Sequence, residues 1–454
     1  MNLSYGIKKL LSVFAAISIA VCCLPFAAAA DGDADWEIWG DIKYCIDGDS
    51  LTIAPKDGME TAAMPNAESR DAVPWYNNRK NIISVTIESG ITHIGDFAFY
   101  GFTDIWSVYD AAYANEKGYK NYLLKYPTSL ESFGAASFKD CSKLSTVIFP
   151  DNLYSADGAR NYGEIPDSLF ENCSALYKMT TQQNRDARVT LPSNINRIGK
   201  KAFSSCESLN ASNGNWLWIT NIVDTIDEYA FYNCSSLKKI SCENGIKLIA
   251  ASAFNGCTSL EDFLIVYGEN SDYFYMPTNF ELLNKAKTEF IRLMPAYRAT
   301  EYTVPDTVKE IGDYAFYSSV NLEKITIPNG VKSIGQDVFG NCPKLSEIYL
   351  PKSIENIDFF ALYGIGTQSV DVYYDGTAED FKKFDVYVPS GIKMHYTVAV
   401  GDLNSDGVIN ILDLIAIKKA IVDKKNVTYQ NDIDGDGYLN AEDMAALKKM
   451  LLTK

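Results

Sequence analysis

The sequence predicts an α/β solenoid with a parallel β-sheet on one face, followed by a small all-α domain at the C-terminal end. Two observations predict this fold. The pattern I-G-x-x-A-F-x-x-C-x-x-L-x-x-I-x-I-P recurs with drift through the middle of the chain, and two acidic loops near the end each run into an amphipathic helix. A short repeat period is typical of solenoids, because stacked units share a core that one unit cannot bury alone.

The first thirty residues predict a secretory signal peptide, residues 1–30. Lys8 and Lys9 precede an apolar run from Leu10 to Pro25, and small residues follow up to Ala30. A charged start, a short apolar centre and a small-residue ending are typical of secretion signals, and the run is short for a membrane span. We therefore expect a secreted, extracellular mature chain with no membrane span after cleavage.

The composition narrows the function classes. The chain has 41 Lys and Arg against 58 Asp and Glu, a formal net charge of −17, so we expect no nucleic-acid partner. Its two histidines, His93 and His395, lie far apart in the sequence, which disfavours His-based triads and His-ligated metals. No G-x-S-x-G or H-E-x-x-H motif is present, which favours a non-catalytic protein.

We expect residues 31–79 to form an N-terminal cap and residues 80–385 to form the repeat array. The L-x-x-I-x-I-P part of each repeat alternates like a short strand, and the I-G-x-x-A-F part turns the chain back. Several steps between repeats are 23 residues and others are longer, up to 62, so insertions interrupt the period. The repeats centre on Phe99, Phe138, Phe170, Phe203, Phe231, Phe254, Phe316 and Phe339, with Leu362 in a last, weaker copy.

These motifs resemble the BspA-type bacterial leucine-rich repeat over about residues 80–375. The resemblance implies stacked strands in a parallel sheet along one side. Because the mature chain is expected to be secreted, its cysteines allow disulfides, but repeat position explains six of the eight and favours a ladder of buried thiols. Cys45 and Cys242 lie off that register. The six are Cys141, Cys173, Cys206, Cys234, Cys257 and Cys342, each three residues after a repeat aromatic.

Three insertions in the array, residues 106–127, 210–220 and 266–302, are rich in aromatic residues. Their side chains either bind sugars or proteins, or cover the edges of the solenoid. Within the last insertion the sequence predicts a helix near residues 280–293. Strand positions such as Glu347 and Tyr349 are predicted to face outward.

Two loops near the C-terminus match D-x-[DN]-x-D-G-x-x-N-x-x-D, thirty residues apart. Calcium is a hard cation that takes six to eight oxygen ligands, and this spacing lets side chains and one carbonyl converge on an ion. We therefore expect two calcium ions. The expected ligands are Asp402, Asn404, Asp406, Val408 (carbonyl), Asn410 and Asp413 in the first loop, and Asp432, Asp434, Asp436, Tyr438 (carbonyl), Asn440 and Asp443 in the second.

The duplicated loop–helix unit over residues 401–454, after a linker at 386–400, resembles a type I dockerin. The resemblance implies that it binds a cohesin module of a cellulosome scaffoldin. It also implies contact positions at the start of each helix and at a later lysine pair. The helix of the first unit begins with two apolar residues, and that of the second begins with a mixed pair. We therefore expect the first unit to provide the dominant cohesin-binding face. These positions are Ile411, Leu412, Lys418 and Lys419, and then Ala441, Glu442, Lys448 and Lys449.

The main hypothesis is a secreted non-catalytic cellulosome component. Its dockerin domain would bind a scaffold cohesin, and its array a polysaccharide or a cell-surface protein. The first alternative is a polysaccharide-degrading enzyme of the glycoside hydrolase or lyase type, because dockerins usually accompany such enzymes. The second alternative is an adhesin or a proteinase inhibitor.

Overall fold

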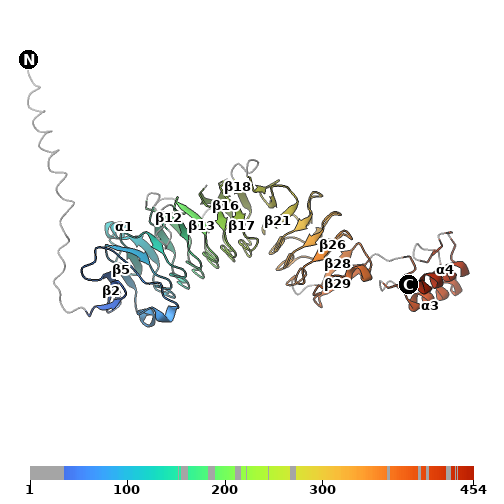
Figure 1. Ribbon diagram of the computed structural model, residues 1–454, viewed down its shortest axis with the longest axis horizontal. Coiled ribbons are helices and arrows are strands. Elements are labelled where there is room, and N and C mark those ends of the chain that lie inside the picture. The colour runs from blue at the N-terminus through green and yellow to red at the C-terminus, as the bar shows by residue number, and fades with distance from the viewer. Residues whose placement is uncertain are drawn as a thin grey trace, which may run out of the picture.

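The computed structural model describes residues 35–151, 153–154, 162–182, 190–209, 216–220, 222–243, 245–265, 272–365, 369–396, 400–404, 408–425, 431–434, 436 and 438–453. An arc of stacked strands leads into a pair of helices at the C-terminal end (Figure 1). The predicted fold class, a solenoid with parallel sheets and a small helical domain, is confirmed. The predicted signal peptide, 1–30, lies outside the described residues.

Each repeat contributes two strands, one from each half of the motif. The L-x-x-I-x-I halves form one set of sheets, and those within the array pair in parallel. The strands of this set are β1 (Glu37–Trp39), β2 (Ile42–Asp47), β3 (Ser50–Pro55), β5 (Ser84–Ile87), β7 (Ser107–Asp110), β8 (Leu123–Tyr126), β10 (Thr146–Phe149), β12 (Lys178–Thr181), β14 (Trp216–Ile219), β16 (Lys239–Cys242), β18 (Asp262–Ile265), β22 (Glu301–Thr303), β24 (Lys324–Thr326), β26 (Glu347–Leu350), β28 (Val370–Tyr374) and β29 (Ile392–Tyr396).

The I-G halves form a second set of strands, which the antiparallel strands of the 266–302 insertion join. These are β4 (Ala62–Ala63), β6 (Ile91–Ile94), β9 (Ser132–Phe133), β11 (Gly163–Ile165), β13 (Ile195–Ile198), β15 (Thr225–Ile226), β17 (Leu248–Ile249), β19 (Phe274–Tyr275), β20 (Glu281–Asn284), β21 (Glu289–Leu293), β23 (Glu310–Ile311), β25 (Ser333–Ile334) and β27 (Asn356–Ile357). The described helices are η1 (Arg70–Ala72), η2 (Tyr76–Asn78), α1 (Ala111–Glu116), α2 (Ala378–Phe381), α3 (Ile411–Val422) and α4 (Ala441–Leu452).

An antiparallel meander of β1, β2 and β3 closes the N-terminal end, and β3 then pairs in parallel with β5. Trp75 is fully buried behind it, and its ring contacts the rings of Tyr44 and Phe99. Its indole N–H donates to the carbonyl of Ala98 at 2.6 Å. The large apolar ring therefore covers the core of the first repeat, and its N–H group is hydrogen-bonded.

A column of repeat aromatics runs through the core. Neighbouring rings from Phe99 to Phe254 stack with centroids 5.3 to 5.7 Å apart. A second stack joins Phe316 to Phe339 at 5.9 Å. Because each ring packs on its neighbours in the stack, the two stacks join the separate repeats into two adjoining cores.

The cysteines satisfy backbone carbonyls beside this column. Each repeat thiol donates to the carbonyl of the preceding repeat's aromatic at 3.0 to 3.2 Å, as Cys206 does to Phe170. All eight cysteines in the described part of the chain are buried, and none of them forms a disulfide. Burial raises the pKa of the Cys342 thiol to about 12, so the thiol stays protonated. The predicted ladder of buried thiols is confirmed.

The structure contains a repeat that the sequence analysis missed. The backbone N–H of Leu293 donates to the carbonyl of Ala315 at 2.8 Å, as the N–H of Phe231 does to Ala253 at 2.9 Å. Leu293 therefore takes the place of a repeat aromatic, and the step of 62 residues is one of 39 followed by one of 23.

The helix predicted near residues 280–293 is wrong. The strands β20 and β21 form an antiparallel hairpin there, and β21 continues in parallel with β23. Leu282 and Leu283 are both buried, one in each of two adjoining cores. Successive apolar residues are typical of a strand covered on both faces, and periodicity alone does not separate such a strand from a helix.

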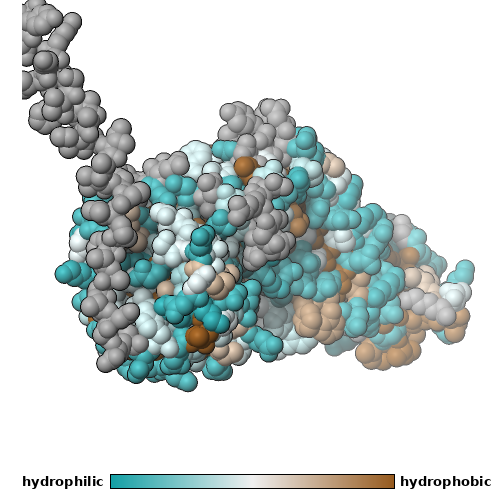
Figure 2. Space-filling model, turned by 60° about the vertical axis from the view of Figure 1, so that its left-hand side comes forward, coloured by the Kyte–Doolittle hydropathy of each residue, from teal (hydrophilic) through white to brown (hydrophobic). Residues whose placement is uncertain are grey.

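The array also extends further than predicted. The strand β29 pairs in parallel with β28 and lies inside the range 386–400 that the sequence analysis assigns to a linker. Figure 2 shows a largely hydrophilic surface along the array in that view, with more apolar surface toward the receding C-terminal end. In the described part of the chain, no helix combines the length and apolar character needed to cross a membrane.

Candidate functional site

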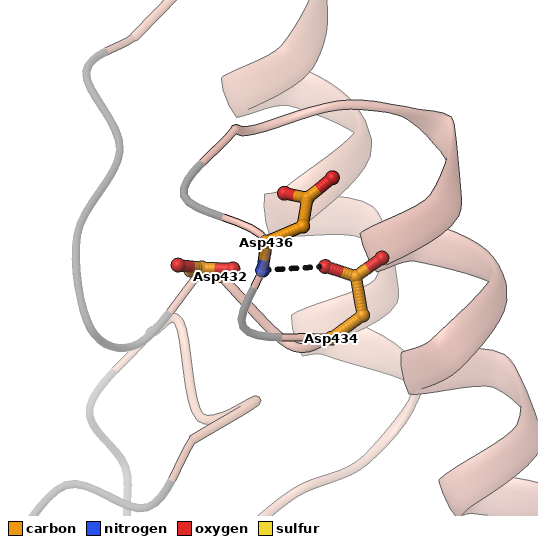
Figure 3. A group of neighbouring side chains, drawn as sticks. All are labelled: Asp432, Asp434 and Asp436. Atoms are coloured by element: carbon orange, nitrogen blue, oxygen red, sulfur yellow. Dashed lines mark hydrogen bonds between the residues drawn. The ribbon is translucent and has the colours of Figure 1, made fainter.

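Three carboxylates meet in the second acidic loop. One oxygen each from Asp432, Asp434 and Asp436 lies within 4.8 Å of the others (Figure 3). The loop is held by short local bonds: the N–H of Asp436 donates to Asp434 at 3.2 Å, and that of Tyr438 to Asp436 at 2.8 Å. Like charges this close repel one another, and an all-oxygen donor set is what calcium prefers. The residues present therefore fit a calcium ion.

The last acidic residue of each loop is completely buried. Asp443 accepts the backbone N–H of Ile433 at 2.7 Å and that of Asn440 at 2.9 Å, and it lies outside the group of three carboxylates. Asp413 plays the same part in the first loop, where it accepts N–H groups of Leu403 and Asn410. These two residues therefore tie each loop to the helix that follows it.

The two asparagines of the loops cap the helices, a role that the sequence analysis did not assign. Asn410 accepts the N–H of Leu412 at 2.7 Å and donates to the carbonyl of Val408 at 3.0 Å. Asn440 accepts the N–H of Glu442 at 2.6 Å. Both complete a capping box with the buried aspartate three residues later. In the first loop Asp402 is buried, and Asp406 lies outside the described residues.

The helices α3 and α4 pack through small apolar cores around Ile417 and Leu447, both fully buried. All eight predicted cohesin-contact residues are exposed on the outer faces. The two faces differ in character. On α3, the side chains of Ile411, Leu412 and Ile415 are 62%, 54% and 59% exposed.

The equivalent positions on α4, thirty residues later, are Ala441, Glu442 and Ala445. Sequence reasoning missed Ile415, although its distance of four residues from Ile411 places both on one helix face. An exposed apolar stripe on a helix this short indicates a surface that a partner covers.

Within the insertion at residues 106–127, aromatic side chains pack on one another. Trp106 stacks on Tyr122 with ring centroids 4.8 Å apart, and Tyr109 stacks on Tyr119 at 5.5 Å. These contacts favour the interpretation that this insertion covers the solenoid. Strand residues follow the predicted alternation: Glu347 and Tyr349 of β26 are partly exposed, and the residues between and after them are buried.

Comparison with known proteins agrees with both parts of the structure. Residues 107–186, 163–275 and 296–379 match the BspA type leucine rich repeat region, and residues 400–452 match the dockerin type I domain. No curated protein matches the sequence.

The comparison with solved structures found leucine-rich repeat proteins of low sequence identity. A leucine rich cell surface protein from Faecalibacterium prausnitzii is 18% identical with a TM-score of 0.50, covering 84% of this chain and 99% of that chain. A leucine-rich repeat protein from Eubacterium ventriosum is 20% identical with a TM-score of 0.45, covering 76% of this chain and 80% of that one.

Proposed function

We propose that this chain, which belongs to the BspA-type leucine-rich repeat family and carries a C-terminal type I dockerin domain, is a non-catalytic adaptor of a cellulosome. The dockerin implies a cohesin partner, and the repeat array suggests a protein ligand. Both domain types are typical of extracellular proteins. In the proposed role, the dockerin anchors the chain to a scaffoldin and the array holds a second partner.

Type I dockerin domains bind calcium, and in this proposal each acidic loop holds one ion. Asp432, Asp434 and Asp436 would supply carboxylate oxygens in the second loop, with the Tyr438 carbonyl. The ion would neutralise three carboxylates that otherwise repel one another, and would fix the start of α4. A domain with so small a core depends on such an ion for much of its folding free energy.

The observation that carries the cohesin proposal is the difference between the two helix faces. The exposed stripe of Ile411, Leu412 and Ile415 offers apolar area for burial, and Lys418 and Lys419 lie exposed further along the same helix. Buried apolar residues with a charged rim are the common anatomy of protein interfaces. We therefore assign the dominant cohesin face to α3.

The test is calorimetry of the full chain against a panel of cohesin modules in millimolar calcium. At least one cohesin is expected to bind with saturation. The variant Ile411→Glu should weaken that binding by at least about tenfold, because a charge would be buried in the apolar contact. The matched variant Ala441→Glu on α4 should change it little. Absence of binding to every cohesin, or equal losses in both variants, would contradict the assignment.

A further inference from the structure

One repeat of the array, the one that contains Leu293, has a shortened turn; each repeat is called a rung below. Leu293 follows its strand residue Phe290 by three positions, whereas Phe316 in the next repeat follows its strand residue Ile311 by five. The pairing of Phe290 with Ile311 fixes this comparison. The turn of the Leu293 rung is therefore two residues short, and it is recessed relative to the turns on either side.

The side chain of a buried arginine lies beneath the recess. Arg292 is 2% exposed, and its guanidinium donates to the carbonyls of Ala251 and Phe254 on one side and to those of Tyr314 and Tyr317 on the other. One side chain thus joins the two flanking turns. Arg292 also donates to the side-chain oxygen of Asn255. The recess is therefore a rigid, built feature of the array.

Tyrosine pairs stand on both sides of the recess. Tyr229 and Tyr232 form one edge-to-face pair, and Tyr314 and Tyr317 form the other, each with centroids 5.7 Å apart. The hydroxyls of Tyr229 and Tyr314 meet across the recess at 3.1 Å. The intervening Phe254 rung has Ser252 and Asn255 where the walls have tyrosine. The four tyrosines line a cleft of about 1140 Å³ that runs on past both pairs.

The floor and rim of this cleft carry polar groups with spare hydrogen-bonding capacity. Asn255 is 1% exposed and lines the cleft; its oxygen accepts from Arg292, and its amide N–H₂ has no partner among the described residues. The side chains of Asn233 and Asp337 line the cleft without a protein hydrogen bond in the described part of the chain. Asn255 lines the cleft, so its amide N–H₂ can donate to a ligand that supplies acceptors.

The chemistry of the lining selects a ligand class. Lys201 also lines the cleft, but its ammonium lies 4.0 Å from the carboxylate of Glu171, and the guanidinium of Arg292 is already occupied by carbonyls. An anion would in addition face the carboxylate of Asp337. A purely apolar ligand would leave the Asn255 amide unpaired. Aromatic faces beside amides and carboxylates suit a molecule with C–H faces and many hydroxyls. The lining also extends from Glu171 to Ile365, across many repeats, which suits a chain more than a single unit.

We propose that this cleft binds a neutral oligosaccharide, with the tyrosine pairs contacting sugar rings and Asn255, Asn233 and Asp337 binding hydroxyls. The inference concerns the array and is independent of the dockerin. Binding should therefore persist in chelator, which separates its failure from a failure of the cohesin proposal.

The experiment is calorimetry of the full chain with cellohexaose, xylohexaose and mannohexaose, and with hexagalacturonate as the charged comparator. At least one neutral hexamer is expected to saturate the chain. Tyr232→Ala, Tyr317→Ala and the shape-conserving Asp337→Asn should each weaken that binding by at least about fivefold. Tyr100→Ala changes a tyrosine at the same repeat position outside the cleft, and should leave binding unchanged.

Three outcomes would overturn the proposal: no neutral hexamer binds, the charged hexamer binds best, or Tyr100→Ala weakens binding as much as the cleft variants do. Thermal melts of each variant show whether its fold is retained, and Asp337→Asn tests the cleft even where a tyrosine variant loses stability.

Discussion

The array and the C-terminal helix pair are stabilised in different ways. The array buries a repeated column of aromatic rings and satisfies its inner carbonyls with thiols. The helix pair buries few side chains completely, chiefly Ile417 and Leu447, and gathers acidic groups in its loops. One region therefore depends on apolar burial along its whole length, and the other on a cation that each loop binds. This difference implies that each region can be disrupted without the other.

The largest expected effect comes from removing calcium. Chelator should unfold the helix pair, because the loop carboxylates would then repel one another, and should lower cohesin affinity by at least about 100-fold. The melting transition of the array should stay within about 2 °C of its position in calcium. Circular dichroism melts of the full chain with and without chelator measure both. A shift of the array transition equal to that of the helices would contradict the comparison.

The second effect comes from breaking the aromatic column. Phe203 is fully buried and stacks on Phe170 and Phe231. Phe203→Ala should destabilise the array by about 3–5 kcal/mol, through lost burial and the cavity left behind. Denaturant unfolding measures this cost. Calcium affinity should be unchanged in the variant, and a weakened calcium affinity would show that the two regions are coupled.

The third effect is a loss of array stability in mild acid. His93 is buried between Ser132 and Asn66, both within hydrogen-bonding distance of its ring, and burial lowers its pKa to about 4. The fold favours the neutral ring, so its contribution is complete above about pH 6.5 and is lost as the pH falls toward 4. The loss is at most about 3 kcal/mol. His93→Gln should flatten the dependence of array stability between pH 6.5 and 5, and an unchanged slope would contradict this assignment.

The smallest effect at neutral pH concerns the reactivity of the thiols. Burial raises the pKa of Cys342 to about 12, so its contribution is complete below about pH 9 and is lost as the pH rises toward 12. At neutral pH the native mature chain, residues 31–454, should react negligibly with a thiol reagent. The same chain, denatured and unreduced, should react at its eight cysteines, because the other two of the ten lie in the predicted signal peptide. Fewer thiols in the denatured chain would mean disulfides.

The sequence predicts the fold where the repeat period is regular and fails where the period is interrupted. The stacked strands and the acidic loops were predictable because their motifs recur in register. The Leu293 rung was missed because it has neither the aromatic at the motif position nor a full-length turn, and it is revealed by its backbone pairing with the next repeat. The cleft beside it follows from that irregularity, and no local motif marks it.

The helix pair shows the same limit at a smaller scale. The loop spacing predicts the oxygen ligands, but it does not distinguish a ligand from a cap, and Asn410 and Asn440 cap their helices. Two of the three residues in the exposed stripe on α3, Ile411 and Leu412, were predicted from the resemblance. The third, Ile415, follows from helical geometry and was missed. The difference in exposed apolar surface between α3 and α4 could be assessed only from the exposure of each side chain in the structure.

The central claim is that calcium shapes the helix pair so that α3 presents its face to a cohesin while the array stays free. Hydrogen–deuterium exchange of the full chain with a saturating cohesin tests it most directly. We expect new protection over Ile411–Val422, only in calcium, with the exchange of the array unchanged. Protection centred on α4, protection within the array, or the same protection in chelator would contradict it.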